Sequence, residues 1–215
     1  MPIMTEPNST NPIRPKRVVV ALTGATGIIY GIRLLEILQT MPGVESHAVI
    51  SPAAKRTLVE ETDTTVKQVE ALADVVYDYR DIGAALASGS FHTHAMVIVP
   101  CSIKTMASLA LSFADNLITR AGDVTLKEGR PLVVVVRETP LHLGHLRLMT
   151  QLAEAGGIIL PPMPAFYNRP QTIDDIVNHT VGRILDRIGL PHDLVKEWQG
   201  TRPARSRRRN EEDEE

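Results

Sequence analysis

RVVVALTGATGIIYGIRLL, residues 17–35, is the stretch of the chain that decides its fold. The β-branched run at 17–22 predicts a buried strand, the glycines at 24 and 27 predict a turn, and the apolar periodicity from residue 28 predicts a helix. Glycine lets the backbone pass close to a bound group, and the unpaired N–H groups at a helix start favour an anion. The sequence therefore predicts a phosphate-binding turn at Thr23–Gly27, and leaves open whether the ligand is a dinucleotide or another phosphorylated molecule.

Composition limits the class of protein. The 215 residues are 43% hydrophobic and carry a formal net charge of −2, which predicts a globular chain without a field suited to nucleic acid. No apolar stretch approaches the ~20 residues of a membrane span. Cys101 is the only cysteine, so no internal disulfide can form, and a reducing compartment is favoured. We expect a soluble cytoplasmic protein without a secretory signal.

The pattern of elements predicts a single α/β domain at 17–200 between two disordered tails, 1–16 and 201–215. The second tail has five arginines followed by an acidic block of similar charge, which predicts a solvated segment rather than a polyanion-binding one. Apolar runs alternate with helical patterns, which predicts an open parallel sheet with helices on both faces. We expect strands near 17–22, 45–50, 95–99, 131–136 and 157–160, and helices at 28–39, 52–61, 66–72, 79–87, 103–112, 115–128, 142–155 and 172–188.

Residues that follow the strands are the candidate ligand contacts, because ligands of such sheets bind at the carboxyl ends of the strands. Ser51 follows the second strand and precedes a proline, which predicts a helix N-cap and a small anion site. Ser102 opens a helix in the same way, and Arg137 and Glu138 emerge together after the fourth strand. Tyr30 stands where a nicotinamide enzyme of the reductase type carries its third glycine, so that class is disfavoured. The strand ends predict a pocket for a phosphorylated ring system.

Further motifs lie along the chain: TGATG at 23–27, SGSF at 88–91, PCSIKT at 100–105, RAGDV at 120–124, LKE at 126–128, RETPL at 137–141, HL at 145–146, PAFY at 164–167, Arg183 and Trp198. Taken together, these motifs resemble one family, the UbiX-type flavin prenyltransferases, whose older names are 3-octaprenyl-4-hydroxybenzoate or aromatic-acid decarboxylase. The resemblance covers roughly 17–200, and it implies a flavodoxin-like fold, commonly assembled as a dodecamer. It also implies transfer of dimethylallyl from dimethylallyl monophosphate to N5 and C6 of reduced FMN, and the product, prenylated FMN, serves a separate UbiD-type decarboxylase.

The resemblance also implies roles for individual residues. The implied FMN contacts are Gly24, Ala25, Thr26, Ser51, Ser102, Ile103, Lys104, Thr105 and Arg137. The implied clamp for the prenyl phosphate is Lys127, Tyr167 and Arg183, with Arg120 reaching an adjacent subunit's site. The remaining active-site positions are Glu61, Glu138 and Trp198, and the hydroxyl of Thr26 is implied to lie near the flavin. A lysine, an arginine and a tyrosine hydroxyl stabilise a departing phosphate without a metal. The candidate base is Glu138, Glu61 or the departing phosphate itself; Glu138 is favoured as the base and Glu61 for substrate gating.

Several alternatives stay open at this point. Glu138 and Arg137 could form only a strand-end ion pair with each other. Lys127, Arg120 and Arg183 could be ordinary solvent-exposed residues on helix surfaces. The histidines at 92, 94, 142 and 145 lack a third grouped ligand, so no metal site is predicted. A non-catalytic FMN carrier and a direct aromatic-acid decarboxylase are the competing functions. The chain departs from the family at Thr26, where serine is usual, and at Gly129, where arginine is usual and where glycine predicts a helix end.

Overall fold

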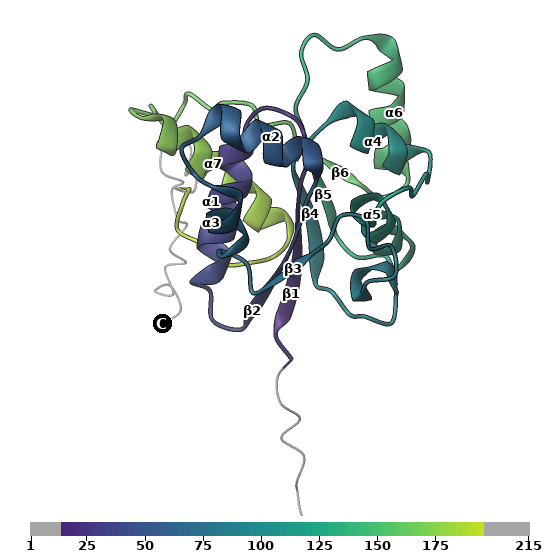
Figure 1. Ribbon diagram of the computed structural model, residues 1–215. Helices are drawn as coiled ribbons and strands as arrows, with labels where there is room; N and C mark the ends of the chain where they lie inside the picture. The colour runs from purple at the N-terminus through teal and green to yellow at the C-terminus, as the bar shows by residue number, and fades with distance from the viewer. Residues whose placement is uncertain (1–13, 196–215) are drawn as a thin grey trace, which may run out of the picture.

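The computed structural model describes residues 14–195, and within them six parallel strands form one sheet (Figure 1). The strand order is β3-β2-β1-β4-β5-β6, and every neighbouring pair runs parallel. β1 and β4 lie at the centre and are apolar on both faces, as strands covered by helices on two sides must be. The strands are β1 (Lys16–Leu22), β2 (Val44–Ile50), β3 (Val75–Tyr77), β4 (Ala95–Cys101), β5 (Leu132–Val136) and β6 (Ile158–Ile159).

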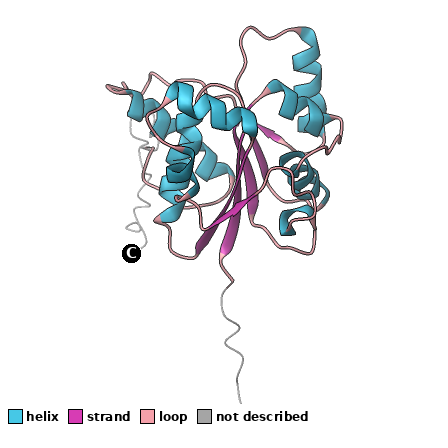
Figure 2. Ribbon diagram, in the orientation of Figure 1, coloured by secondary structure: helices cyan, strands magenta, loops and turns pink. Residues whose placement is uncertain are grey.

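Helices cover both faces of the sheet, and each layer buries its own apolar cluster (Figure 2). One cluster packs α1, α2, α3 and α7 against side chains such as Val18 and Val20, and the other packs α4, α5 and α6 against Val19 and Ala21. Alternate residues of β1 therefore serve opposite cores. The helices are α1 (Ile28–Gln39), α2 (Pro52–Glu61), α3 (Val66–Glu70), α4 (Ile103–Ala110), α5 (Leu117–Lys127), α6 (Leu143–Glu154) and α7 (Ile173–Arg187).

The predicted α/β architecture is confirmed, with two differences along the described chain. The strand at Val75–Tyr77 was not predicted, because three residues are too few to show a periodicity. The helix predicted at 79–87 is wrong except for a short 3-10 turn at Ala85–Ala87. The carboxylates of Asp78 and Asp81 accept hydrogen bonds from the backbone two residues on, and such turns compete with a helix.

Gly31 provides the close contact between α1 and the sheet. A Cβ atom at this position would lie 2.5 Å from the carbonyl oxygen of Val99 on β4, so no larger residue fits. Tyr30, one position earlier, is not part of this contact. Its side chain is partly buried against the apolar cluster that packs α1, α2, α3 and α7 on one face of the sheet. The close approach that dinucleotide folds obtain from their third glycine is thus made here one residue later.

Candidate functional site

Thr23 links the carboxyl ends of the central strands β1 and β4. Its hydroxyl donates to the carbonyl of Pro100 at 2.8 Å and accepts from the backbone N–H of Ser102 at 2.8 Å. The backbone N–H of Ser51 donates to the carbonyl of Leu22 at 3.0 Å, so the end of β2 is held against the end of β1. The loops that follow β1, β2 and β4 are therefore fixed relative to one another. The sequence had singled out this turn without giving the buried Thr23 a role.

Two serines cap helices at this edge of the sheet, as predicted. The hydroxyl of Ser51 accepts from the N–H of Ala54 at 3.1 Å, and that of Ser102 accepts from the N–H of Thr105 at 3.3 Å. The hydroxyls of Ser102 and Thr105 lie 3.1 Å apart. Neither α2 nor α4 has an acidic residue in its first turn. Two helix starts with neutral, hydroxyl-bearing caps therefore lie at one edge, an arrangement that favours an anion.

The turn at Thr23–Gly27 differs from its predicted role as a phosphate cradle. Oε2 of Glu61, at the end of α2, accepts from the backbone N–H of Gly27 at 2.9 Å and of Ile28 at 3.0 Å. The N–H groups that start α1 thus already have an anionic partner. The predicted contacts Gly24, Ala25 and Thr26 lie beside this carboxylate, at the same edge as Ser51.

Arg137 and Glu138 follow β5 at the same edge, and both side chains are exposed. The backbone N–H of Arg137 donates to the carbonyl of Cys101 at 3.1 Å, which holds the two strand ends together. Oε1 of Glu138 accepts from the N–H of Thr139 at 2.9 Å. Among the described residues no ion pair joins Arg137 to Glu138, so the simple strand-end pair is not what the structure contains.

The residues expected to hold the prenyl phosphate lie in three separate places. Arg120 and Lys127 are on α5, which packs on one face of the sheet, and Arg183 is on α7, which packs on the other (Figure 1). Lys127 ends α5 just before β5 begins, so it lies at the amino edge of the sheet, opposite Ser51. Tyr167 belongs to the loop after β6. A single chain does not bring this set together.

The three cations are partly exposed, and each has a carboxylate partner on its own segment. Arg120 Nη1 lies 2.9 Å from Asp123 Oδ2, Arg183 Nη1 lies 2.7 Å from Asp186 Oδ2, and Lys127 pairs with Glu128. The cation side chains are 37%, 53% and 49% exposed, respectively. Surface pairs of this kind contribute only about 0–1 kcal/mol. A phosphate can therefore replace these carboxylates at little cost.

A cavity of about 360 Å³ lies between β6 and α7, and Arg183 and His179 are among its lining residues. The hydroxyl of Tyr167 lies 3.2 Å from Nε2 of His179. Burial lowers the pKa of His179, and the positive charge of Arg183 lowers it further. The imidazole beside Tyr167 is therefore held in its neutral form, in which one ring nitrogen can exchange a hydrogen bond with the tyrosine.

Comparison with known proteins identifies the family. A sequence model of the family described as Flavoprotein matches residues 6–185. The flavin prenyltransferase UbiX of Escherichia coli K12 is 58% identical over 187 residues, which cover 86% of this chain and 99% of that protein. The chain belongs to the UbiX-type flavin prenyltransferases.

Solved structures of UbiX proteins match the fold closely. A dodecameric FMN-dependent UbiX-like decarboxylase from Escherichia coli O157:H7 superposes with a TM-score of 0.84 at 49% identity, covering 86% of this chain and 100% of that chain. The AnUbiX protein, in complex with FMN and dimethylallyl pyrophosphate, superposes with a TM-score of 0.85 at 46% identity, covering 87% of this chain and 99% of that chain. The predicted flavodoxin-like fold is thereby confirmed.

The remaining residues noted in the sequence include one that lies outside the described range. Trp198 lies beyond the described range, as do most of the two predicted tails. The rings of His142 and His145 lie with centroids 3.6 Å apart and are tilted by 35° to one another. Within 14–195 no group of three or more histidine, cysteine or acidic side chains is arranged to hold a metal ion. No helix in this range is long and apolar enough to cross a membrane. Cys101 is a free, buried cysteine.

Proposed function

We propose that this protein transfers a dimethylallyl group from dimethylallyl monophosphate to N5 and C6 of reduced FMN. The observation that carries the proposal is the pairing of two kinds of anion site in a UbiX-type chain. One is built from hydroxyls and helix starts at the carboxyl edge of the sheet. The other consists of the cations Arg120, Lys127 and Arg183, whose carboxylate partners a phosphate can replace. Two anion sites suit two phosphorylated substrates.

The residues at the carboxyl edge fit the phosphate of FMN. Ser51, Ser102 and Thr105 present three hydroxyls at two helix starts without a nearby acidic residue in the first turns. We assign the FMN phosphate to these caps rather than to the start of α1, because Glu61 already holds the N–H groups there. Gly24, Ala25, Thr26, Ile103, Lys104 and Arg137 complete the proposed flavin contacts. Reduced FMN, when bound, supplies the nucleophilic N5 and the neighbouring C6 that accept the prenyl group.

The cations and Tyr167 are proposed to stabilise the departing phosphate. Negative charge grows on that phosphate as its bond to the allyl carbon breaks, and Lys127, Arg183 and a tyrosine hydroxyl are suited to receive it. Among the carboxylates, we assign proton acceptance to Glu138, which emerges exposed at the flavin edge. Glu61 is engaged with α1 and is assigned to positioning. Trp198 remains a proposed active-site residue.

The complete site is proposed to form between subunits. Lys127 and Ser51 lie at opposite edges of one sheet, so a prenyl phosphate held by Lys127 reaches a flavin at Ser51 only on a neighbouring copy. Large apolar side chains are exposed where such contacts are needed: Leu111 and Phe113 after α4 and Met163 and Phe166 after β6 are each at least 61% exposed. Exposed apolar surface of this kind marks interfaces. A homo-oligomer follows, and we propose a dodecamer, as in the Escherichia coli relative.

Anaerobic incubation with reduced FMN and dimethylallyl monophosphate tests the reaction. Mass spectrometry of the released flavin should show the addition of one C5H8 unit, and an unchanged mass would overturn the proposal. Arg183→Ala should abolish turnover while the affinity for FMN stays within about twofold, as expected for a residue outside the flavin contacts. A parallel loss of FMN affinity would favour a non-catalytic carrier. A UbiD-type decarboxylase is the proposed recipient, tested by whether the released product activates that apoenzyme.

A further inference from the structure

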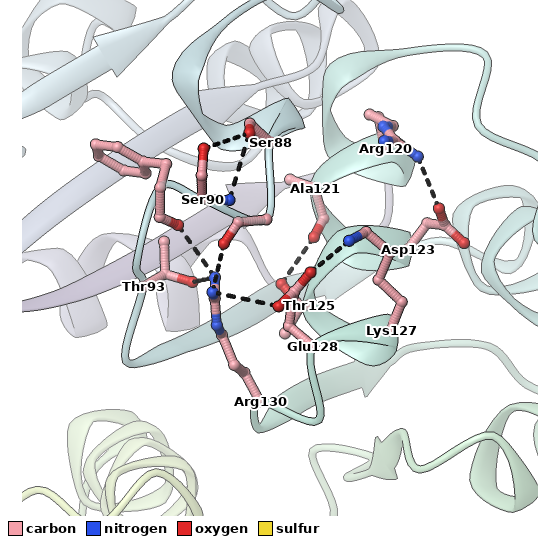
Figure 3. A network of polar contacts seen from close by, with 12 residues as sticks. Ser88, Ser90, Thr93, Arg120, Ala121, Asp123, Thr125, Lys127, Glu128 and Arg130 are labelled. Carbon is pink, nitrogen blue, oxygen red and sulfur yellow. Dashed lines mark hydrogen bonds and ion pairs between the residues drawn. The ribbon is translucent and has the colours of Figure 1, made fainter.

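Arg130 holds the loop that precedes β4 with a fork of hydrogen bonds (Figure 3). Its Nη2 donates to the carbonyl of Gly89 at 2.7 Å, and its Nη1 donates to the carbonyl of Phe91 at 3.1 Å and to the hydroxyl of Thr93 at 3.3 Å. The side chain is only 13% exposed. A nearly buried guanidinium with three oxygen partners in the loop fixes the backbone of 89–93 firmly. Its Nη2 also lies 3.9 Å from Oε2 of Glu128, the carboxylate that pairs with Lys127 (Figure 3).

The end of α5 directs Arg130 toward this loop. Gly129 adopts a left-handed φ of 64°, which a residue with a side chain takes up only with strain. The N–H of Gly129 donates to Leu126 and that of Arg130 donates back to Thr125 at 3.0 Å, which is the Schellman pattern of a helix end. The chain therefore reverses sharply after Lys127 and Glu128, and the guanidinium returns beside the helix that carries Lys127.

Gly89 links the loop to the Lys127–Glu128 pair. A Cβ atom at Gly89 would lie 2.1 Å from Oε1 of Glu128 and 2.9 Å from Nζ of Lys127. The backbone of the loop at Gly89 thus packs directly against the Lys127–Glu128 ion pair. The hydroxyls of Ser88 and Ser90 lie 2.8 Å apart on either side of this glycine. If the backbone of the 89–93 loop moves away, the ammonium group of Lys127 has room to take other positions.

We propose that Arg130 is a positioning residue for Lys127: it fixes the 89–93 loop, the loop confines the Lys127 ammonium, and the confined ammonium binds the prenyl phosphate. This inference rests on the proposed function, because it assigns Arg130 to the phosphate clamp of that reaction. The conformational entropy of the long lysine side chain is lost when the protein folds and not when the substrate binds. The phosphate therefore binds more tightly than it would to an unconfined lysine.

Kinetics of Arg130→Gln and Arg130→Lys test the proposal in the full-length protein. Both variants lose the planar fork, and Arg130→Lys keeps the positive charge. We expect each to raise the KM for dimethylallyl monophosphate about tenfold, while the affinity for FMN stays unchanged. Arg33→Gln is the matched control, since it removes a guanidinium that bonds to Asn178 and Glu36, far from the loop. That control should leave both constants unchanged.

A double-mutant cycle separates positioning from a general structural role. In a Lys127→Met background, Arg130→Gln should cause little further loss of kcat/KM, because the group it positions is gone. Full additivity of the two losses would overturn the proposal. So would an unchanged KM in a folded Arg130→Gln.

Gly89→Ala supplies a second variant if the Arg130 variants fold poorly. The new Cβ would meet only the flexible ends of Glu128 and Lys127, so the fold should persist while the ammonium shifts. We expect the same selective rise in KM, and an unchanged KM would again contradict the proposal. Failure of the wild-type protein to prenylate FMN would instead contradict the proposed function, so the two failures are distinguishable.

Discussion

Oε2 of Glu61 lies 2.9 Å from the backbone nitrogen of Gly27, and it accepts the hydrogen bond of that N–H across 34 residues of sequence. The same oxygen accepts from Ile28 at 3.0 Å, so one carboxylate satisfies two of the N–H groups that begin α1. The end of α2 is thereby tied to the start of α1, and the carboxylate of Glu61 is held next to Thr26 at the carboxyl edge of the sheet.

Glu61→Gln should destabilise the protein by about 0.5–1 kcal/mol, because the amide oxygen can still accept the two hydrogen bonds but lacks the charge that faces the helix dipole. Urea unfolding followed by circular dichroism measures the change. Glu60→Gln is the matched control, since the structure shows no hydrogen bond or ion pair for that exposed side chain among the described residues. Equal stabilities of the two variants would contradict this account of Glu61.

Contacts within a few residues were predictable from the sequence, and contacts between distant strand ends were not. Ser51 and Ser102 were predicted as helix caps because a cap is set by its next three residues. The bond from Glu61 to Gly27 depends on how α2 returns across the sheet, which no local pattern specifies. The relative positions of the residues in the implied phosphate clamp could not be predicted either, because residue types do not show that Lys127 and Ser51 lie at opposite edges of the sheet.

Thr23→Val should cost about 1–3 kcal/mol of unfolding free energy, since valine matches the shape but leaves the N–H of Ser102 without its hydroxyl partner. The carbonyl of Pro100 loses the hydroxyl bond and keeps only the bond from the backbone N–H of Thr23 at 3.2 Å. Thr23→Ser keeps the hydroxyl and should restore most of the loss. Thr57→Val, in α2, removes only a bond from the Thr57 hydroxyl to the carbonyl of Ala53 and should change stability little. If Thr23→Val and Thr57→Val were equally stable, the strand-end link would be unimportant.

Mixed oligomers test whether the site is shared between subunits. Lys127→Met and Ser102→Ala are each expected to be nearly inactive alone, because each removes one of the two proposed anion sites. Unfolding and refolding the two variants together at equal amounts should restore activity at about a quarter of the sites, those with both partners intact. Activity that stays at the level of the separate variants, in oligomers shown to be mixed, would place both residues in one subunit's site.

Cys101 should resist thiol reagents in the folded protein at mildly alkaline pH. Burial raises the pKa of its thiol far above the usual value, so the nucleophilic thiolate is not formed. Labelling by a maleimide at about pH 8 should therefore be slow without urea and fast in its presence. Because the folded-state pKa is raised, the stabilising contribution of this group is complete below the unfolded pKa and declines as the pH rises above it. Rapid labelling of folded protein would contradict the assignment.

His47 should make the protein less stable in acid. Its ring is buried, Nδ1 lies 3.0 Å from the hydroxyl of Tyr77, and Nε2 lies 2.8 Å from Oε1 of Glu45 without the alignment of a hydrogen bond. Desolvation lowers the pKa of His47; Arg17 lowers it further, and the nearby carboxylates of Glu45 and Asp74 only partly oppose this.

A lowered folded-state pKa means that the stabilising contribution of His47 is complete above the unfolded value of about 6.5 and is lost as the pH falls below it. Urea midpoints measured between about pH 7.5 and about pH 5.5 should therefore fall more steeply for the wild type than for His47→Gln. His92→Gln, at an exposed histidine, should keep the wild-type slope. Parallel slopes for the wild type and His47→Gln would show that the acid sensitivity arises elsewhere, because only a group with different folded and unfolded pKa values links stability to pH.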